Sequence, residues 1–162
     1  MTFTLVHVVI SLIGIGSGVV VSLGMLTGKR LDGWTGLFLA STVATSVTGF
    51  GFPFDHLLPS HIVGGISLVV LAVASYARYG RHLAGGWRAA YVSGAVVAFY
   101  LNVLVLIVQL FRRVPALTAL APTQSEPPFA IAQLGALALF IALGVMATKR
   151  FATTGATTGG NR

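Results

Sequence analysis

Five long apolar runs, separated by short polar segments, restrict how this chain can fold more than any other feature. They lie at residues 3–26, 34–52, 61–77, 89–111 and 129–147. Each has about 17 to 24 residues, the length that an α-helix rising about 1.5 Å per residue needs to cross roughly 30 Å of hydrocarbon. None of them alternates polar and apolar residues as a strand of a membrane barrel does. Hydrocarbon offers no partner to backbone N–H and C=O groups, so we predict five transmembrane helices.

The composition agrees with a chain whose solvent is mostly lipid. Of the 162 residues, 56% are hydrophobic and 8% are charged, and the mean hydropathy is +0.91. A soluble domain commonly has about a quarter of its residues charged. We therefore predict an all-α integral membrane protein, a five-helix bundle formed by residues 1–151 and surrounded by the lipid bilayer. The Gly- and Thr-rich segment 152–162 is expected to be a flexible tail.

The basic residues predict an orientation. Two of them fall on one side of the five-span arrangement, Arg112 and Arg113, and eight fall on the other side. The eight are Lys29, Arg30, Arg78, Arg81, Arg88, Lys149, Arg150 and Arg162. Cytoplasmic loops of membrane proteins carry an excess of Lys and Arg. We expect an amino terminus outside, a carboxyl terminus in the cytoplasm, and a multi-pass protein of a bacterial-type plasma (inner) membrane.

Charge and cysteine content exclude several classes of function. The net charge of +7 comes from residues at the ends of apolar runs, and no basic amphipathic element is available to enter a nucleic acid groove. We expect no nucleic acid partner. The chain has no cysteine, which excludes disulfides, thiolate metal sites and a cysteine nucleophile.

A binding site is expected at the outer face, because all six prolines lie in the two predicted outer loops. Proline fixes φ and cannot continue a helix, so these loops should be stiff and shaped. Most of the chemically capable side chains fall at the same level. The candidate residues are His7, Asp55, His56, His61, Gln109, Arg112, Glu126 and Gln133.

Two histidines, His7 and His61, open the first and third runs from the same side and so lie at similar depth. Together they can ligate a b-type haem iron or, with Asp55 or Glu126, a divalent metal ion. A hydrogen-bonded interfacial pair without metal, or a proton-linked role, explains the same residues. The sequence leaves these alternatives open.

Polar and small residues inside the runs predict helix packing. Gly14 and Gly18 form a GxxxG pair, which lets a neighbouring backbone approach closely. Asn102 falls near the middle of the fourth run and is costly facing lipid, so we expect it to point into the bundle.

No catalytic set emerges, since the Gly-rich stretch 14–18 lies inside a predicted membrane helix and not at a strand-to-helix turn. The sequence leans against an enzyme and favours a non-catalytic accessory or homo-oligomeric bundle that docks other membrane helices. The alternatives are a redox protein that holds haem or a metal at His7 and His61, and a small oligomeric transporter or channel.

Overall fold

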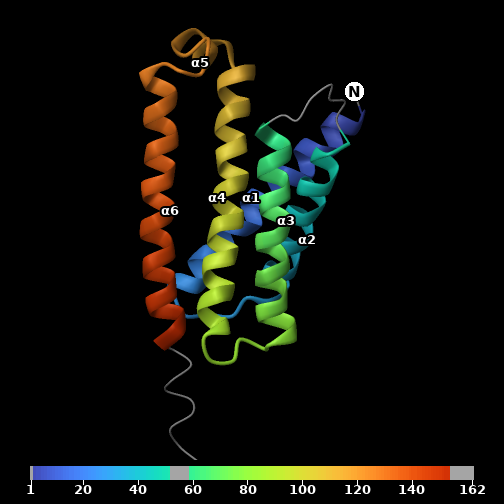
Figure 1. Cartoon of the computed structure of the whole chain (residues 1–162), viewed down its shortest axis with the longest axis vertical. Coiled ribbons are helices and arrows are strands. Elements are labelled where there is room, and N and C mark those ends of the chain that lie inside the picture. Colours follow the sequence, from blue (N-terminus) through green and yellow to red (C-terminus); the bar gives the residue numbers. More distant parts are fainter. Residues whose placement is uncertain (1, 52–58, 154–162) are drawn as a thin grey trace, which may run out of the picture.

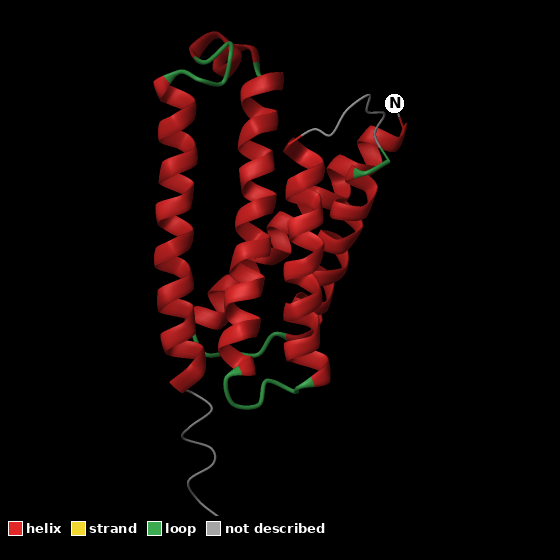
Figure 2. Ribbon diagram, viewed as in Figure 1, coloured by secondary structure: helices red, strands yellow, loops and turns green. Residues whose placement is uncertain are grey.

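The computed structural model describes residues 2–51 and 59–153, and within them every regular element is a helix (Figures 1 and 2). In chain order the elements are α1 (Thr2–Leu26), α2 (Asp32–Gly49), α3 (Pro59–Ser75), the π-helical turn η1 (Tyr76–Gly80), α4 (Trp87–Arg113), the short α5 (Pro115–Leu120) and α6 (Pro127–Thr153). The all-helical prediction is confirmed. Of the predicted tail, α6 includes the first two residues, and residues 154–162 lie outside the described part of the chain.

Four helices are long and apolar enough to cross a membrane. They are Thr2–Leu26, His61–Gly80, Trp87–Arg113 and Pro127–Phe151. The fifth predicted span, 34–52, corresponds to α2, which is less apolar because it is rich in Ser and Thr. Its 18 residues still extend about 27 Å, and Figure 1 shows it standing beside α3 along the long axis of the bundle.

Three hydroxyl groups on α2, those of Ser41, Ser46 and Thr48, donate to carbonyl groups of the preceding turn. Ser41 donates to the Leu37 carbonyl at 2.7 Å, and Thr48 donates to the Ala44 carbonyl at 2.7 Å. Such bonds to the preceding turn let Ser and Thr enter an apolar environment without an unpaired donor. The polar composition of α2 is therefore compatible with a place inside a membrane bundle.

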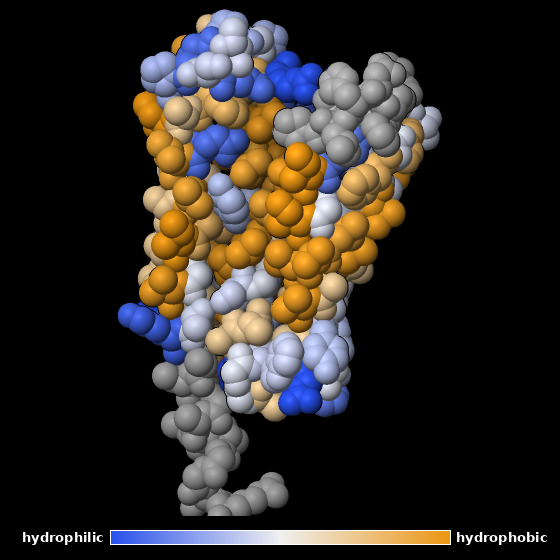
Figure 3. All heavy atoms as spheres, in the orientation of Figure 1, coloured by the Kyte–Doolittle hydropathy of each residue, from blue (hydrophilic) through white to orange (hydrophobic). Residues whose placement is uncertain are grey.

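The two ends of the bundle differ in charge. One end, here called the basic end, holds the α1–α2 loop, η1, the loop before α4 and the last turns of α6. The opposite end, here called the α5 end, holds the amino terminus and α5 (Figure 1). Figure 3 shows an apolar belt between the two, with hydrophilic residues above and below it. This distribution is what a bilayer-embedded protein needs.

Close helix contacts centre on small residues and on a row of aromatic rings. A Cβ built on Gly18 of α1 would lie 2.8 Å from the Phe99 ring of α4, and one on Gly94 would lie 3.0 Å from the Ala74 Cβ of α3. The Phe99 ring also makes an edge contact with Phe140 of α6, at 4.9 Å between centroids. Helix α4 is therefore the element on which α1, α3 and α6 assemble.

Candidate functional site

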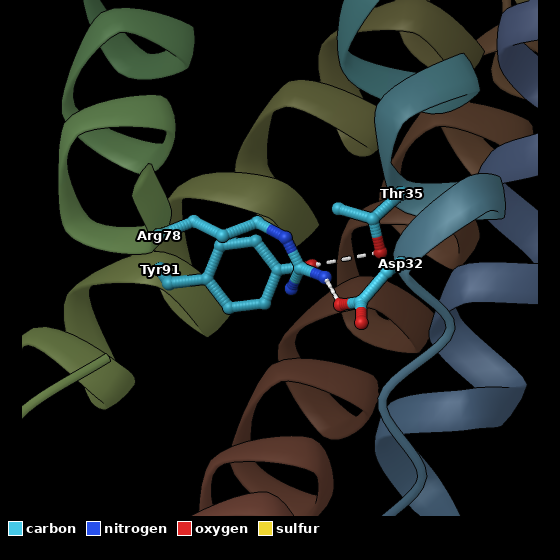
Figure 4. Close-up of polar contacts among 4 residues, drawn as sticks. All are labelled: Asp32, Thr35, Arg78 and Tyr91. Carbon is cyan, nitrogen blue, oxygen red and sulfur yellow. Dashed lines mark hydrogen bonds and ion pairs between the residues drawn. The ribbon is translucent and has the colours of Figure 1, made fainter. Parts of the chain in front are cut away.

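A polar group that links three elements of the bundle lies at the basic end and is built around Arg78. The π-helical turn η1 follows α3 directly and carries Arg78, whose side chain is only 3% exposed. Its guanidinium donates to the Asp32 carboxylate at the start of α2 (Figure 4). The Asp32 side chain is 74% exposed, so the ion pair joins a buried cation to a solvated anion.

Two further side chains complete this group, Tyr91 of α4 and Thr35 of α2. The Arg78 guanidinium carbon lies 5.2 Å from the centroid of the Tyr91 ring. The Tyr91 hydroxyl shares a hydrogen bond with the Thr35 hydroxyl at 3.3 Å (Figure 4). Asp32, Thr35, Arg78 and Tyr91, here called the Arg78 cluster, thus link α2, η1 and α4.

The contacts of the Arg78 cluster are those of a group that stabilises the packing of three helical elements. A buried guanidinium is costly unless it is paired and hydrogen-bonded, and the carboxylate and the aromatic face supply that compensation. The cavity beside the cluster has a volume of about 10 Å³, space for about one water molecule. It is too small for a substrate.

Sequence reasoning missed this cluster and treated Arg78 only as a charge that orients the chain. One signal was available, because Asp32 is the only acidic residue among the many basic residues of that end. A lone acid in such surroundings indicates an ion pair. Which base it meets depends on the π-helical turn, which rotates Arg78 into the bundle.

A second polar group lies near the middle of the bundle, where α1, α2 and α4 meet. A Cβ on Gly14 would lie 3.1 Å from Asn102 Nδ2 and 3.3 Å from both the Ser41 and Thr42 hydroxyl oxygens. Asn102 Nδ2 and the Thr42 hydroxyl are buried atoms with no hydrogen-bond partner among the described residues. Because Gly14 has no side chain, the Asn102 amide and the Ser41 and Thr42 hydroxyls fit beside it in the interior of the bundle.

Two of the histidines predicted to lie at the outer face, His7 and His61, contact the α5 end of α2. His7 Nδ1 and the Thr48 hydroxyl lie 2.7 Å apart, and the His61 ring lies 5.6 Å from the Phe50 ring. Asp55 and His56 lie outside the described residues. Within residues 2–51 and 59–153, no three His, Asp or Glu side chains are grouped so as to hold a metal ion.

The remaining outer-face candidates lie on α4, α6 and the loop between them. Glu126 accepts hydrogen bonds from the backbone N–H and hydroxyl of Thr123 and from the Ser125 N–H. Slight desolvation raises its pKa, but these bonds outweigh it and hold the pKa below the ordinary value of 4.5. Gln133 Nε2 donates to the Leu104 carbonyl at 3.4 Å, whereas Gln109 and Arg112 are exposed.

Those predicted outer-face residues that the structure describes thus form two groups, His7 and His61 around the end of α2, and the others on α4, α6 and the loop between them. That they bind a common ligand stays a prediction. Together the helices and their polar centres define a class, an all-helical bundle of apolar helices suited to a membrane. No protein-family profile, curated protein or solved structure matches the chain.

Proposed function

We propose that the protein is a non-catalytic, multi-pass membrane protein that associates with other transmembrane helices through α6. The partner is a second copy of the chain or a subunit of a larger complex. In this proposal all five long helices cross a bacterial-type plasma membrane, and the basic end lies in the cytoplasm. The observation that carries the proposal is the exposed, small-residue face of α6.

Helix α6 is far less buried than the other apolar helices. Only 6% of its most apolar 18-residue stretch is buried, against 28–39% in the other three. It is fixed to the bundle by Phe140, Ala147 and Phe151, which are buried and lie on one face at 3.6 residues per turn. Most of the α6 surface is left to lipid or to another protein.

The opposite face of α6 has small residues in its middle turns, between the exposed side chains of Ile131 and Val145. Gly135, Ala138 and Ala142 are exposed and, at spacings of three and four, share one face. A Cβ on Gly135 would meet nothing within 4 Å. Elsewhere on the long helices, α6 included, the large exposed side chains are mostly Val, Leu and Ile. Small residues in a membrane helix let a second helix approach closely, and this supports docking at this face.

Cysteine cross-linking in native membranes tests the proposal directly, because the chain has no cysteine of its own. We expect Ala138→Cys to form a disulfide-linked dimer, or an adduct with a partner subunit, on mild oxidation. The matched control is Val69→Cys, at an exposed position of α3 outside the α6 face. If Ala138→Cys forms no more cross-links than the control, and the gently solubilised protein is a monomer without partner, the proposal is wrong.

A redox protein with b-type haem or a metal ion is the alternative. It is favoured by one observation, that His7 and His61 both contact the same end of α2. The visible absorption spectrum and metal content of the purified protein separate the two functions. A haem spectrum that His7→Phe abolishes would establish the alternative. A colourless, metal-free protein from cells supplied with iron, copper and zinc would remove it.

A further inference from the structure

A groove of about 490 Å³ runs between α4 and α6. Its walls are almost entirely apolar and include Val96 and Tyr100 of α4 and Leu137, Ile141 and Gly144 of α6. The groove adjoins the outward face of α6 but is centred closer to α4, because Leu137, Gly144 and Thr148 lie about a third of a helical turn from Ala138 and Ala142, whereas Val145 and Lys149 lie at the shared edge.

Apart from Tyr100, the groove residues with polar side chains lie toward the basic end. Ser93 lies near the beginning of α4, and Thr148 and Lys149 lie near the end of α6. In Figure 3 the lower end of α6 is hydrophilic and the flank above it is apolar. The groove thus combines a cationic, hydroxyl-bearing end with a hydrocarbon-like interior.

Its dimensions match one hydrocarbon chain and are too small to enclose a helix. From Leu137 to Lys149 the groove follows α6 for about 18 Å, close to half of the roughly 30 Å hydrocarbon thickness. Spread over that length, 490 Å³ corresponds to a mean cross-section of about 27 Å². A helix about 10 Å wide needs roughly 80 Å². The groove therefore has the length of one leaflet and the width of one acyl chain.

We propose that this groove binds one acyl chain of an anionic phospholipid, drawn from the leaflet at the basic end, with the headgroup phosphate on Lys149. Basic pockets between transmembrane helices are the usual sites for anionic headgroups. Arg88 and Arg150 add positive charge at the same end while donating to the Phe151 and Leu26 carbonyls. The proposal rests on membrane residence but not on helix docking through α6.

Two glycines of α6 provide a matched pair of variants. Gly144 lines the groove, and a Cβ there would lie 3.5 Å from Val96 Cγ1, whereas Gly135 faces open space. The protein is purified in mild detergent, and retained phospholipid is counted and identified by native mass spectrometry. We expect one anionic phospholipid on the wild-type protein and on Gly135→Leu, and at least an approximately tenfold loss on Gly144→Leu. The same two changes should have the opposite effects on the Ala138→Cys cross-link. Gly135→Leu should weaken the cross-link, and Gly144→Leu should leave it unchanged.

The headgroup contact and the fold have their own variants. Lys149→Gln should retain lipid but lose the preference for anionic over zwitterionic headgroups, and Lys149→Arg should keep it. Val97→Phe narrows the same groove from α4, so it should lose lipid even if Gly144→Leu fails to fold. Retention by Val97→Phe at the wild-type level, or an unchanged preference in Lys149→Gln, overturns the proposal. An Ile141→Cys cross-link between two copies would also overturn it, because the groove would then face a protein.

Discussion

Asp32→Asn tests whether the Arg78 cluster stabilises the bundle. The change removes the counter-charge of a guanidinium that is 3% exposed. A hydrogen bond between charged groups contributes about 1.5–3 kcal/mol, and the 74% exposure of the Asp32 side chain moves the value toward the lower limit. We expect Asp32→Asn to lower the free energy of unfolding by about 1–2 kcal/mol. The assay is reversible unfolding in mixed micelles of mild detergent and SDS, followed by far-ultraviolet circular dichroism.

The double variant separates this ion pair from other effects. Arg78→Met loses the same bond together with its contact to the Tyr91 ring, so we expect a loss of about 2–3 kcal/mol. Because Arg78→Met already removes the partner of Asp32, adding Asp32→Asn should cause little further loss. The coupling energy should be about 1–2 kcal/mol. Losses that add within about 0.5 kcal/mol would refute the cluster as a stabilising unit.

Three further predictions concern other parts of the chain. Gly18→Val places a Cβ 2.8 Å from the Phe99 ring and should cost about 1–3 kcal/mol of unfolding free energy in the same assay, whereas Gly16→Val, with nothing within 4 Å, should be close to neutral. The pKa of Glu126 is lowered in the folded protein, so its stabilising contribution is present above 4.5 and is lost as the pH falls through the folded pKa. The protection factors of the backbone amides that donate to Glu126, taken relative to the intrinsic exchange rate at each pH, should therefore fall on acidification, and the Gln variant should lack this dependence. Asn102→Leu should change the unfolding free energy by less than about 1 kcal/mol, because Asn102 Nδ2 is a buried donor without a partner in the described part of the chain; a larger loss would indicate that a water or ligand is held there.

The long helices are predictable because each apolar run is long enough to cross hydrocarbon. The structure extends them, since α4 spans Trp87–Arg113 where the apolar run covers 89–111. Polar and amphipathic residues at helix ends continue the same backbone hydrogen bonding beyond the apolar stretch. The predicted span 34–52 is a helix as well, but its Ser and Thr residues make α2 less apolar than the other four long helices.

The side-chain partners were much less predictable. A GxxxG pair indicates close helix packing but does not say whether the neighbouring helix belongs to the same chain. Gly18 packs against Phe99 of α4, and Gly14 faces Asn102, so both glycines are buried by the chain itself. The exposed small residues of α6, Gly135, Ala138 and Ala142, were not singled out from the sequence.

The Arg78 cluster was out of reach for a different reason. It depends on one π-helical turn and on the mutual placement of α2, η1 and α4, neither of which appears in local periodicity. His7 and Thr48 are 41 residues apart in the chain and meet only in the folded bundle. Sequence spacing could identify capable residues at one end of the bundle, but not the hydroxyl or ring that each one contacts.

The most direct test of the account is the sidedness of Lys29→Cys and Arg81→Cys toward a membrane-impermeant maleimide. Lys29 lies after α1 and Arg81 lies after η1, and both are exposed. If α2 crosses the bilayer and the basic end is cytoplasmic, both cysteines react in inverted vesicles and neither reacts in intact cells. If only the four most apolar helices cross, the two cysteines react from opposite sides, which would contradict the five-helix membrane bundle.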